Sequence, residues 1–183
     1  MTLSTKEWGP SLWSILHTIA KLYPNNPSVK DKNMAFQLTK YLALIIPCKT
    51  CQKHYIQNYT RYKPEFSSGS KFFKWTVKIH NLVNKKNNKH QINNEKAYQI
   101  TNNKINSEKL SKLLRFLVNE SNKGTTDGRY LQKFIESLLY LSNHKTITWK
   151  MNDNNNRNQN QIGNNQMNNA PFNKNNGFSN RHW

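Results

Sequence analysis

Cysteine is nearly absent from this 183-residue chain, which contains only Cys48 and Cys51. Two cysteines are too few for a disulfide-stabilised scaffold. They lie three positions apart, so their thiols can close a small disulfide. In a reducing compartment an isolated Cys-x-x-Cys pair is more often metal-binding or catalytic than structural. The pair is therefore the first candidate for chemistry in this chain.

Long apolar runs are missing as well. The longest one, residues 41–47, is far short of the ~20 residues that a membrane-spanning helix needs. Residues 1–7 contain no apolar segment of the kind that a secretory signal carries. We therefore expect a protein without a membrane span that is made without secretion.

Acidic residues are scarce. Nine Asp and Glu stand against 28 Lys and Arg, which gives a net charge of +19 and a pI near 10.0. Such a surface suits nucleic acid, an anionic membrane or acidic partners. Lysine and asparagine are, however, simply abundant here, and the lysines are scattered over both halves of the chain. Charge alone does not mark a nucleic-acid-binding module.

Strand-like alternation is absent from residues 1–100, where apolar residues instead recur at helical spacing. The pattern predicts an all-α domain. We expect a turn over residues 4–9, because Pro10 fits a first helical turn and fits a helix interior badly. Asn26 and Pro27 are expected as the cap and first residue of the next helix. The predicted helices cover residues 10–22, 27–46, 47–59, 70–86 and 93–100, the last one short.

The second half of the chain contains two further amphipathic segments, residues 107–119 and 127–142, which a short loop joins. They predict a helical hairpin that packs on the first domain, serves a dimer interface or docks a partner. Residues 151–183 contain 14 asparagines and too few apolar residues to offset the entropy of ordering, which predicts disorder. The predicted organisation is a domain at 1–101, a helical extension at 104–145 and a disordered tail at 151–183.

The dithiol follows Pro47 and is expected in a first helical turn, where the helix dipole favours a thiolate. Three kinds of site compete. A zinc site lacks a second ligand pair at regular spacing, and together with the basic charge it gives the alternative function of a helical zinc- and nucleic-acid-binding module. A thioredoxin-like site needs a βαβ setting. A dithiol beside a flavin needs rings and amides that stack on and bind the cofactor.

The sequence offers residue types that suit a flavin, but each also has a simpler explanation. Tryptophans on apolar faces are more often core residues, histidines are more often satisfied core or surface residues, and an asparagine near a helix end is usually a cap. The residues alone therefore leave the flavin as one of three possibilities. The set consists of Trp8, Trp13, His17, Tyr55, Trp75, His80, Asn81 and Asn84.

The order and spacing of these motifs carry a family resemblance. Trp-Gly-x₃-Trp-x₃-His begins at Trp8, Cys-x-x-Cys follows at Cys48, and Trp-x₄-His-Asn-x-Val-Asn-x-Lys begins at Trp75. This combination resembles the FAD-linked sulfhydryl oxidases of the Erv/ALR type over roughly residues 5–101. The resemblance implies an all-α fold, a four-helix bundle plus a short fifth helix that binds FAD. It also implies that two substrate thiols become a disulfide while O₂ becomes hydrogen peroxide.

The resemblance assigns roles residue by residue. Cys51 would lie next to the flavin in a charge-transfer contact, and Cys48 would be the outer cysteine that engages substrate. Lys86 or Lys89 would meet the pyrophosphate, where a cation is electrostatically reasonable. His54 and Tyr55, one helical turn after the dithiol, are further candidates for the flavin side. The implied FAD contacts are Trp8, Gly9, Trp13 and His17 on one side and Trp75, His80, Asn81, Val83, Asn84 and Lys86 on the other.

The chain also departs from the family pattern. Many members carry a second, shuttle cysteine pair, whereas this chain has no further cysteine. A dithiol substrate protein must then reach Cys48 directly, or a thioredoxin-like adaptor must hand electrons over. Members of this kind occur in large DNA viruses, and the Lys/Asn bias fits such a source, which would place disulfide formation in virion proteins within the host cytoplasm. The resemblance further implies a homodimer, and it requires neither membrane nor nucleic acid.

Overall fold

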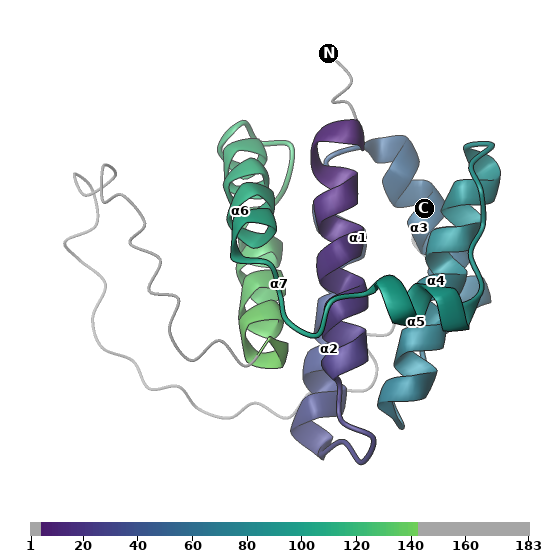
Figure 1. Ribbon diagram of the computed structural model, residues 1–183. Coiled ribbons are helices and arrows are strands. Elements are labelled where there is room, and N and C mark those ends of the chain that lie inside the picture. Colours follow the sequence, from purple (N-terminus) through teal and green to yellow (C-terminus); the bar gives the residue numbers. More distant parts are fainter. Residues whose placement is uncertain (1–4, 143–183) are drawn as a thin grey trace, which may run out of the picture. The chain divides into compact units, whose positions relative to one another are not determined.

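The computed structural model describes residues 5–142, which form seven α-helices and no strand (Figure 1). The predicted all-α fold is confirmed. The sequence intervals predicted as helices all contain one, although several boundaries differ. The helices are α1 (Thr5–Leu22), α2 (Val29–Ile45), α3 (Lys49–Arg61), α4 (Gly69–Lys86), α5 (Asn94–Ile100), α6 (Ser107–Asn122) and α7 (Gly128–Leu141).

The predicted turn before Pro10 is wrong, because α1 already begins at Thr5 and runs through Pro10. A proline at this position lacks the N–H that would bond to the carbonyl of Lys6, so the helix loses one bond near its start. Trp8 and Gly9 are buried together with Leu12 of the next turn. Burial of this face outweighs the local preference for a break.

Two helix starts also lie later than predicted. The cap of α2 is Ser28, whose hydroxyl accepts from the N–H of Asp31 at 3.1 Å while the Asp31 carboxylate accepts from the N–H of Ser28 at 2.8 Å. This reciprocal capping box satisfies two N–H groups that would otherwise lack a partner. The cap of α3 is Cys48, so Pro47 precedes the cap and is not the first helical residue.

Within the first hundred residues, α4 contacts three other helices. It lies against α1, contacts α3, and carries the short α5, while α3 also contacts α2. Figure 1 shows α3, α4 and α5 on one side of α1. The side chains buried at these contacts are mainly apolar and include Leu12, Ile15, Leu16, Ile19, Phe72, Phe73, Trp75, Val77 and Ile79.

The hairpin of α6 and α7 packs on the other side of the same bundle: α6 lies along α1, and α7 lies along α2 (Figure 1). The hydroxyl of Tyr140 donates to the Asp31 carboxylate at 3.1 Å, and that of Thr126 donates to the carbonyl of Ile45 at 3.4 Å. Of the three predicted roles for the hairpin, packing on the first domain is the one that the structure contains. The apolar side chains that it buries are Leu110, Leu113, Leu114, Leu117, Leu131, Phe134, Leu138 and Leu141.

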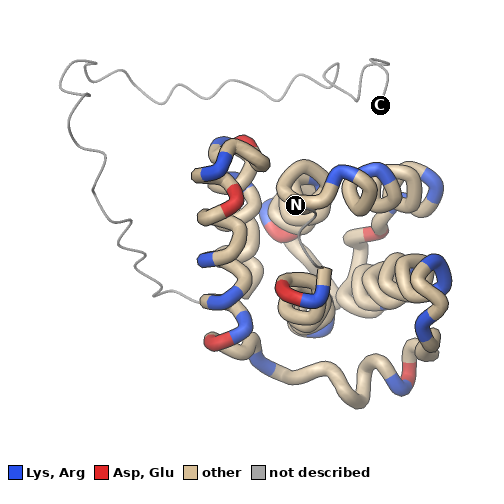
Figure 2. The backbone as a smooth tube through the Cα atoms, turned by 90° about the horizontal axis from the view of Figure 1, so that it is seen from above, with Lys and Arg blue, Asp and Glu red and all other residues tan. Residues whose placement is uncertain are grey.

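All seven described helices belong to one compact unit. The tail predicted to be disordered lies outside the described residues. Figure 2 shows Lys and Arg distributed along the tube of the described helices, with few Asp or Glu among them. Among the described helices, none is both long and apolar enough to span a bilayer.

Gly69 allows α4 to begin directly against the end of α1. It is buried, and a Cβ at this position would lie 2.3 Å from the carbonyl oxygen of Tyr23. We expect Gly69→Ala to lower the free energy of unfolding by about 1–3 kcal/mol, because the backbone must shift to admit the methyl group. Urea unfolding measures the change.

Gly128→Ala is the matched control, since Gly128 is exposed at the start of α7 and its Cβ would lie 3.4 Å from the Ser121 hydroxyl. We expect its stability to stay within about 0.5 kcal/mol of the parent chain. Equal effects of the two substitutions would contradict a specific clash at Gly69.

Candidate active site

Cys48 and Cys51 form a disulfide with their Cα atoms 5.2 Å apart. Cys48 caps α3, and its sulfur accepts a hydrogen bond from the N–H of Cys51 at 3.2 Å. Both residues are half-buried, so the disulfide remains reachable from solvent. Cys51 stands in the first turn, where the unpaired N–H groups of a helix start favour a thiolate over a thiol.

The charge around the dithiol has one sign. Lys49 and Lys53 are exposed on α3, and no acidic residue occurs between Asp31 and Glu65 in the sequence. Four Lys and Arg occur between Pro47 and Pro64 alone. Positive charge near a cysteine stabilises its thiolate and attracts an anionic thiolate substrate.

Three of the predicted site residues form a ring cluster, which we define as Trp13, His17 and His80. The Trp13 and His80 rings are parallel within 3°, with centroids 4.2 Å apart. The ring of His17 lies 5.1 Å from that of His80, and its Nε2 is 2.9 Å from Nδ1 of His80. The packing of α1 on α4 thus brings together residues 63 positions apart in the chain.

Both histidines of the ring cluster favour the neutral form. Burial, with a smaller contribution from His80, lowers the pKa of His17 to about 3. Burial, with a smaller contribution from the nearby charge of Lys89, lowers the pKa of His80 to about 4. At neutral pH the cluster therefore offers two uncharged imidazoles.

Thr76 contacts the ring cluster, although it was not among the predicted site residues. Its Oγ1 lies 2.9 Å from Nδ1 of His17, on the side of the imidazole away from His80. The signal available in the sequence was its position four residues before His80, which places both on one face of a helix. No motif in the sequence marks Thr76, so this spacing alone would not have selected it.

Asn81 and Asn84 hold the segment that follows α4. The side-chain amide of Asn81 donates to the carbonyl of Ile92 at 2.7 Å, and its oxygen accepts from the N–H of the same residue at 3.1 Å. The amide of Asn84 donates to the carbonyl of His90 at 3.1 Å, and its backbone carbonyl accepts from the N–H of Lys89 at 2.8 Å. These contacts fold residues 88–92 back along α4 and keep Lys89 near His80.

His54 joins α3 to α4 through a contact between its Nε2 and the Lys86 ammonium group. Burial, followed by the charges of Lys86 and Lys53, lowers the pKa of His54. An uncharged His54 can accept a hydrogen bond from Lys86. Val83 is half-buried one turn earlier on α4.

The start of α1 has an unusual combination of burial and unfilled space. Trp8 is buried, and its indole N–H has no hydrogen-bond partner among the described residues. Gly9 is also buried, yet a Cβ built on it would meet no atom within 4 Å. A buried donor without a partner costs about 1–3 kcal/mol, so its presence calls for a ligand or a function.

Tyr55 and Trp75 point into the protein core and do not join the ring cluster. The hydroxyl of the fully buried Tyr55 donates to the carbonyl of Thr39 at 3.0 Å. The indole N–H of Trp75 donates to the carbonyl of Tyr62 at 2.6 Å, and its ring meets the edge of Tyr59. Both side chains tie α3 to its neighbours, which matches the simpler of their two explanations.

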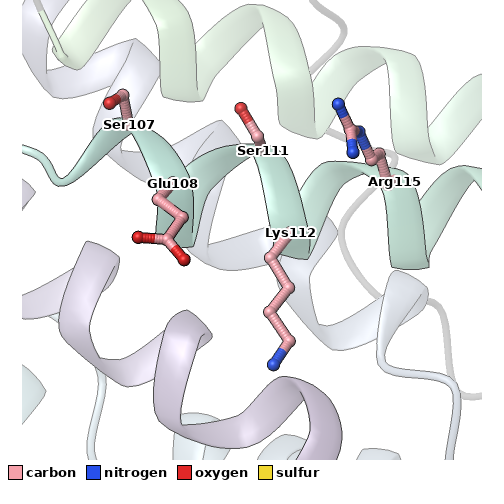
Figure 3. A pocket seen from close by; sticks show the side chains of 5 residues that line it. All are labelled: Ser107, Glu108, Ser111, Lys112 and Arg115. Atoms are coloured by element: carbon pink, nitrogen blue, oxygen red, sulfur yellow. The ribbon is translucent and has the colours of Figure 1, made fainter.

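A separate hollow of about 530 Å³ lies on α6, away from the dithiol (Figure 3). Its lining comes from α6 alone, and Figure 3 shows Glu108 and Lys112 on one side of the helix and Ser111 and Arg115 on the other. Nothing in this set suggests a reaction. Among residues 5–142, no three His, Cys, Asp or Glu side chains are placed to hold a metal ion, so the alternative zinc site finds no ligand set there.

The chain is an all-α bundle. It carries a redox-capable dithiol at a helix start and a cluster of rings on neighbouring helices, which places it in the class of helical dithiol proteins. Comparison with known proteins gives the family. The model of the Erv1/Alr family matches residues 10–107, more than half of the chain, and the chain belongs to this family. The predicted resemblance is confirmed. The match ends where α6 begins, so the hairpin lies beyond it.

Several curated relatives are named as FAD-linked sulfhydryl oxidases. The FAD-linked sulfhydryl oxidase of African swine fever virus (isolate Tick/Malawi/Lil 20-1/1983) is 33% identical over 82 residues, which cover 45% of this chain and 69% of the relative. The probable FAD-linked sulfhydryl oxidase R368 of Acanthamoeba polyphaga mimivirus is 32% identical over 85 residues, which cover 45% and 59%. The chain spans about half the length of relatives such as this one and rice ERV1, of which 43% is covered at 30% identity.

Solved structures agree on the fold. The crystal structure of the yeast Erv1 core superposes with a TM-score of 0.51 at 25% identity, covering 56% of this chain and 87% of that one. The FAD binding domain of Erv1 from Saccharomyces cerevisiae gives a TM-score of 0.51 at 26% identity, with coverages of 54% and 94%.

The depressed pKa of His17 predicts a pH-dependent stability. Above pH 6.5, the ordinary pKa, both folded and unfolded chains hold a neutral imidazole. As the pH falls, the unfolded chain takes up a proton that the folded chain refuses until about pH 3. We expect the free energy of unfolding to fall below pH 6.5 by up to about 1.4 kcal/mol per pH unit from this group.

Urea unfolding at pH 7 and pH 5 tests this expectation. His17→Gln should show a smaller loss between the two pH values than the parent chain, whatever its stability at pH 7. His90→Gln provides the matched substitution at an exposed histidine outside the ring cluster. An unaltered pH dependence in His17→Gln would argue against a buried neutral imidazole.

Proposed function

We propose that this protein is an FAD-dependent thiol oxidase that forms disulfides in substrate proteins with O₂ as the electron acceptor. The observation that carries the proposal is the Cys48–Cys51 disulfide at the start of α3 in a chain of the Erv1/Alr family. The names of the viral and plant relatives support it.

The residues around the ring cluster suit a flavin dinucleotide. The unpaired indole N–H of Trp8 can donate to a bound group, and the open space at Gly9 admits one close to the backbone. The flat rings of Trp13 and His80 offer stacking surface. Lys85, Lys86 and Lys89 concentrate positive charge at the end of α4, which suits a pyrophosphate.

Residues of three helices and of the segment after α4 would build the FAD site. We propose that α1 contributes Trp8, Gly9, Trp13 and His17, that α3 contributes His54, and that α4 and the segment after it contribute His80, Asn81, Val83, Asn84, Lys86 and Lys89. Tyr55 and Trp75 would support the site from the core. The chemistry that FAD supplies when bound is the acceptance of two electrons from the reduced dithiol and their delivery to O₂, which becomes hydrogen peroxide.

The dithiol exchanges with substrate in two steps. A substrate thiolate attacks Sγ of Cys48, the bond between Cys48 and Cys51 breaks, and Cys51 leaves as a thiolate that the start of α3 stabilises. The second substrate thiolate then attacks the substrate sulfur of the mixed disulfide and displaces Cys48. The substrate is oxidised to a disulfide and the Cys48–Cys51 pair is reduced. The two protons of the substrate thiols end on the two cysteine sulfurs, or in solvent for a cysteine that stays a thiolate.

The 183 residues contain one cysteine pair, so no second pair within them relays electrons to Cys48. We propose either a dithiol substrate protein or a thioredoxin-like adaptor as the donor. Relatives in African swine fever virus, mimivirus and Invertebrate iridescent virus 6 support a role in disulfide formation in virion proteins, within the host cytoplasm or the virion.

The absorbance spectrum of the purified protein and oxygen uptake with dithiothreitol test the proposal together. We expect flavin absorbance in the parent chain, and a loss of turnover of at least about 1,000-fold in Cys51→Ser with the flavin still bound, because a serine hydroxyl cannot exchange with a disulfide. Cys48→Ser should lose turnover to a similar extent.

Thr50→Ala is the matched control, since Thr50 lies between the two cysteines and is exposed. Its turnover should stay far above that of either cysteine variant, because alanine at this exposed position leaves both thiols in place. A colourless protein that takes up no FAD on refolding, or one that contains zinc instead, would refute the thiol oxidase proposal.

A further inference from the structure

Thr76 sets the direction of a chain of hydrogen bonds that ends at His80. It is fully buried, and its hydroxyl donates to the carbonyl of Phe73 at 2.7 Å, one turn earlier in α4. A hydroxyl has a single hydrogen and two lone pairs. With the hydrogen committed to Phe73, the oxygen can only accept from its other neighbour, Nδ1 of His17 at 2.9 Å.

The next link follows from the chemistry of a neutral imidazole, which carries one N–H and one lone pair. Because Nδ1 of His17 donates to Thr76, Nε2 of His17 holds the lone pair. Its neighbour at 2.9 Å, Nδ1 of His80, must therefore be the donor. Nε2 of His80 is then left with a lone pair, and it has no hydrogen-bond partner among the described residues.

The opposite direction is disfavoured at its first link. It would require Thr76 to donate to His17, which would leave the Thr76 oxygen and the Phe73 carbonyl oxygen 2.7 Å apart with no hydrogen between them. Two oxygen acceptors at that distance in a buried site repel each other. Protonation of His17 would reverse its bond to His80, and protonation of His80 would turn its Nε2 into a donor, but burial of both imidazoles disfavours either event at neutral pH.

We propose that Thr76, acting through His17, holds Nε2 of His80 as a hydrogen-bond acceptor for an N–H or O–H group of the bound nucleotide. This inference rests on the proposed function for the identity of the nucleotide. The acceptor discriminates by chemistry, because phosphate and carbonyl oxygens have no hydrogen to offer it. In FAD the available donors are the adenine amino group, the flavin imide N–H and the hydroxyls of ribose and ribityl.

Thr76 is therefore a positioning residue and not a contact residue. It is fully buried behind His17 in the hydrogen-bond chain, with His17 between it and His80. Its effect on a ligand passes through the tautomers of two imidazoles. That effect can be read without any enzymatic turnover, because nitrogen chemical shifts distinguish a protonated ring nitrogen from a bare one.

The first test is NMR of the full chain, as purified, with ¹⁵N-labelled histidine at pH 7. We expect His17 and His80 to carry the proton on Nδ1 and a bare Nε2, with the signals assigned through His17→Gln and His80→Gln. A protonated Nε2 on His80, or an imidazolium at either position, would overturn the proposal. This result does not depend on the cofactor. The tautomers can therefore be as proposed although the thiol oxidase function is refuted, and the function can be confirmed although the tautomers differ.

The second test compares Thr76→Val with Thr76→Ser. Valine keeps the shape of threonine but cannot accept from His17, so we expect His17 to move its proton to Nε2 and His80 to become a donor at its outer nitrogen. The dissociation constant for FAD should then rise about tenfold, the equivalent of one hydrogen bond. Serine keeps the hydroxyl and should retain both the parent tautomers and the parent affinity within about twofold.

Two outcomes of this comparison would count against the proposal: parent tautomers in Thr76→Val, or equal losses of affinity in both variants. If Thr76→Val does not fold, the spectra of the parent chain and Thr76→Ser still decide the tautomers.

A FAD analogue with hypoxanthine in place of adenine locates the donor. The adenine amino group is the donor if the analogue binds about tenfold more weakly than FAD to the parent chain but not to Thr76→Val. If the ratio of the two dissociation constants is the same in both proteins, another group of FAD is the donor.

Discussion

The burial of α1 against α4 is the constraint on which the candidate site depends. This contact shields His17 from most of the solvent, sets its two nitrogens against Thr76 and His80, and places Trp13 parallel to the His80 ring. Desolvation then makes both imidazoles neutral, and neutrality is what gives each of them one donor and one acceptor. A looser packing would admit water, and the nitrogens would lose their fixed roles.

The helices were predictable because apolar spacing reports the buried face of each one, as in Leu12, Leu16 and Ile19 of α1. Their starts were less so. Pro10 argued for a break that the burial of Trp8 and Gly9 overrides, and Ser28 caps α2 because Asp31 reciprocates its hydrogen bond. Such outcomes depend on contacts that a local pattern does not contain.

The candidate site divides in the same way. The dithiol is local, so Cys48 and Cys51 were evident from their spacing, and the tryptophan and histidine motifs indicated the family. The contact between His17 and Thr76 joins positions 59 apart, and no periodic pattern in the sequence predicts it. Tyr55 and Trp75 show the converse, since aromatic side chains suited to a cofactor lie in the core with their polar atoms bonded to backbone carbonyls.

The α6–α7 hairpin covers the outer faces of α1 and α2 with a segment of the same chain. Because the hairpin is tethered, its effective concentration at those faces is set by the short connection after α5 and does not fall on dilution. A second molecule would have to displace it to reach those faces. The scaffold that carries the ring cluster is therefore closed by an intramolecular contact, at any concentration of the protein.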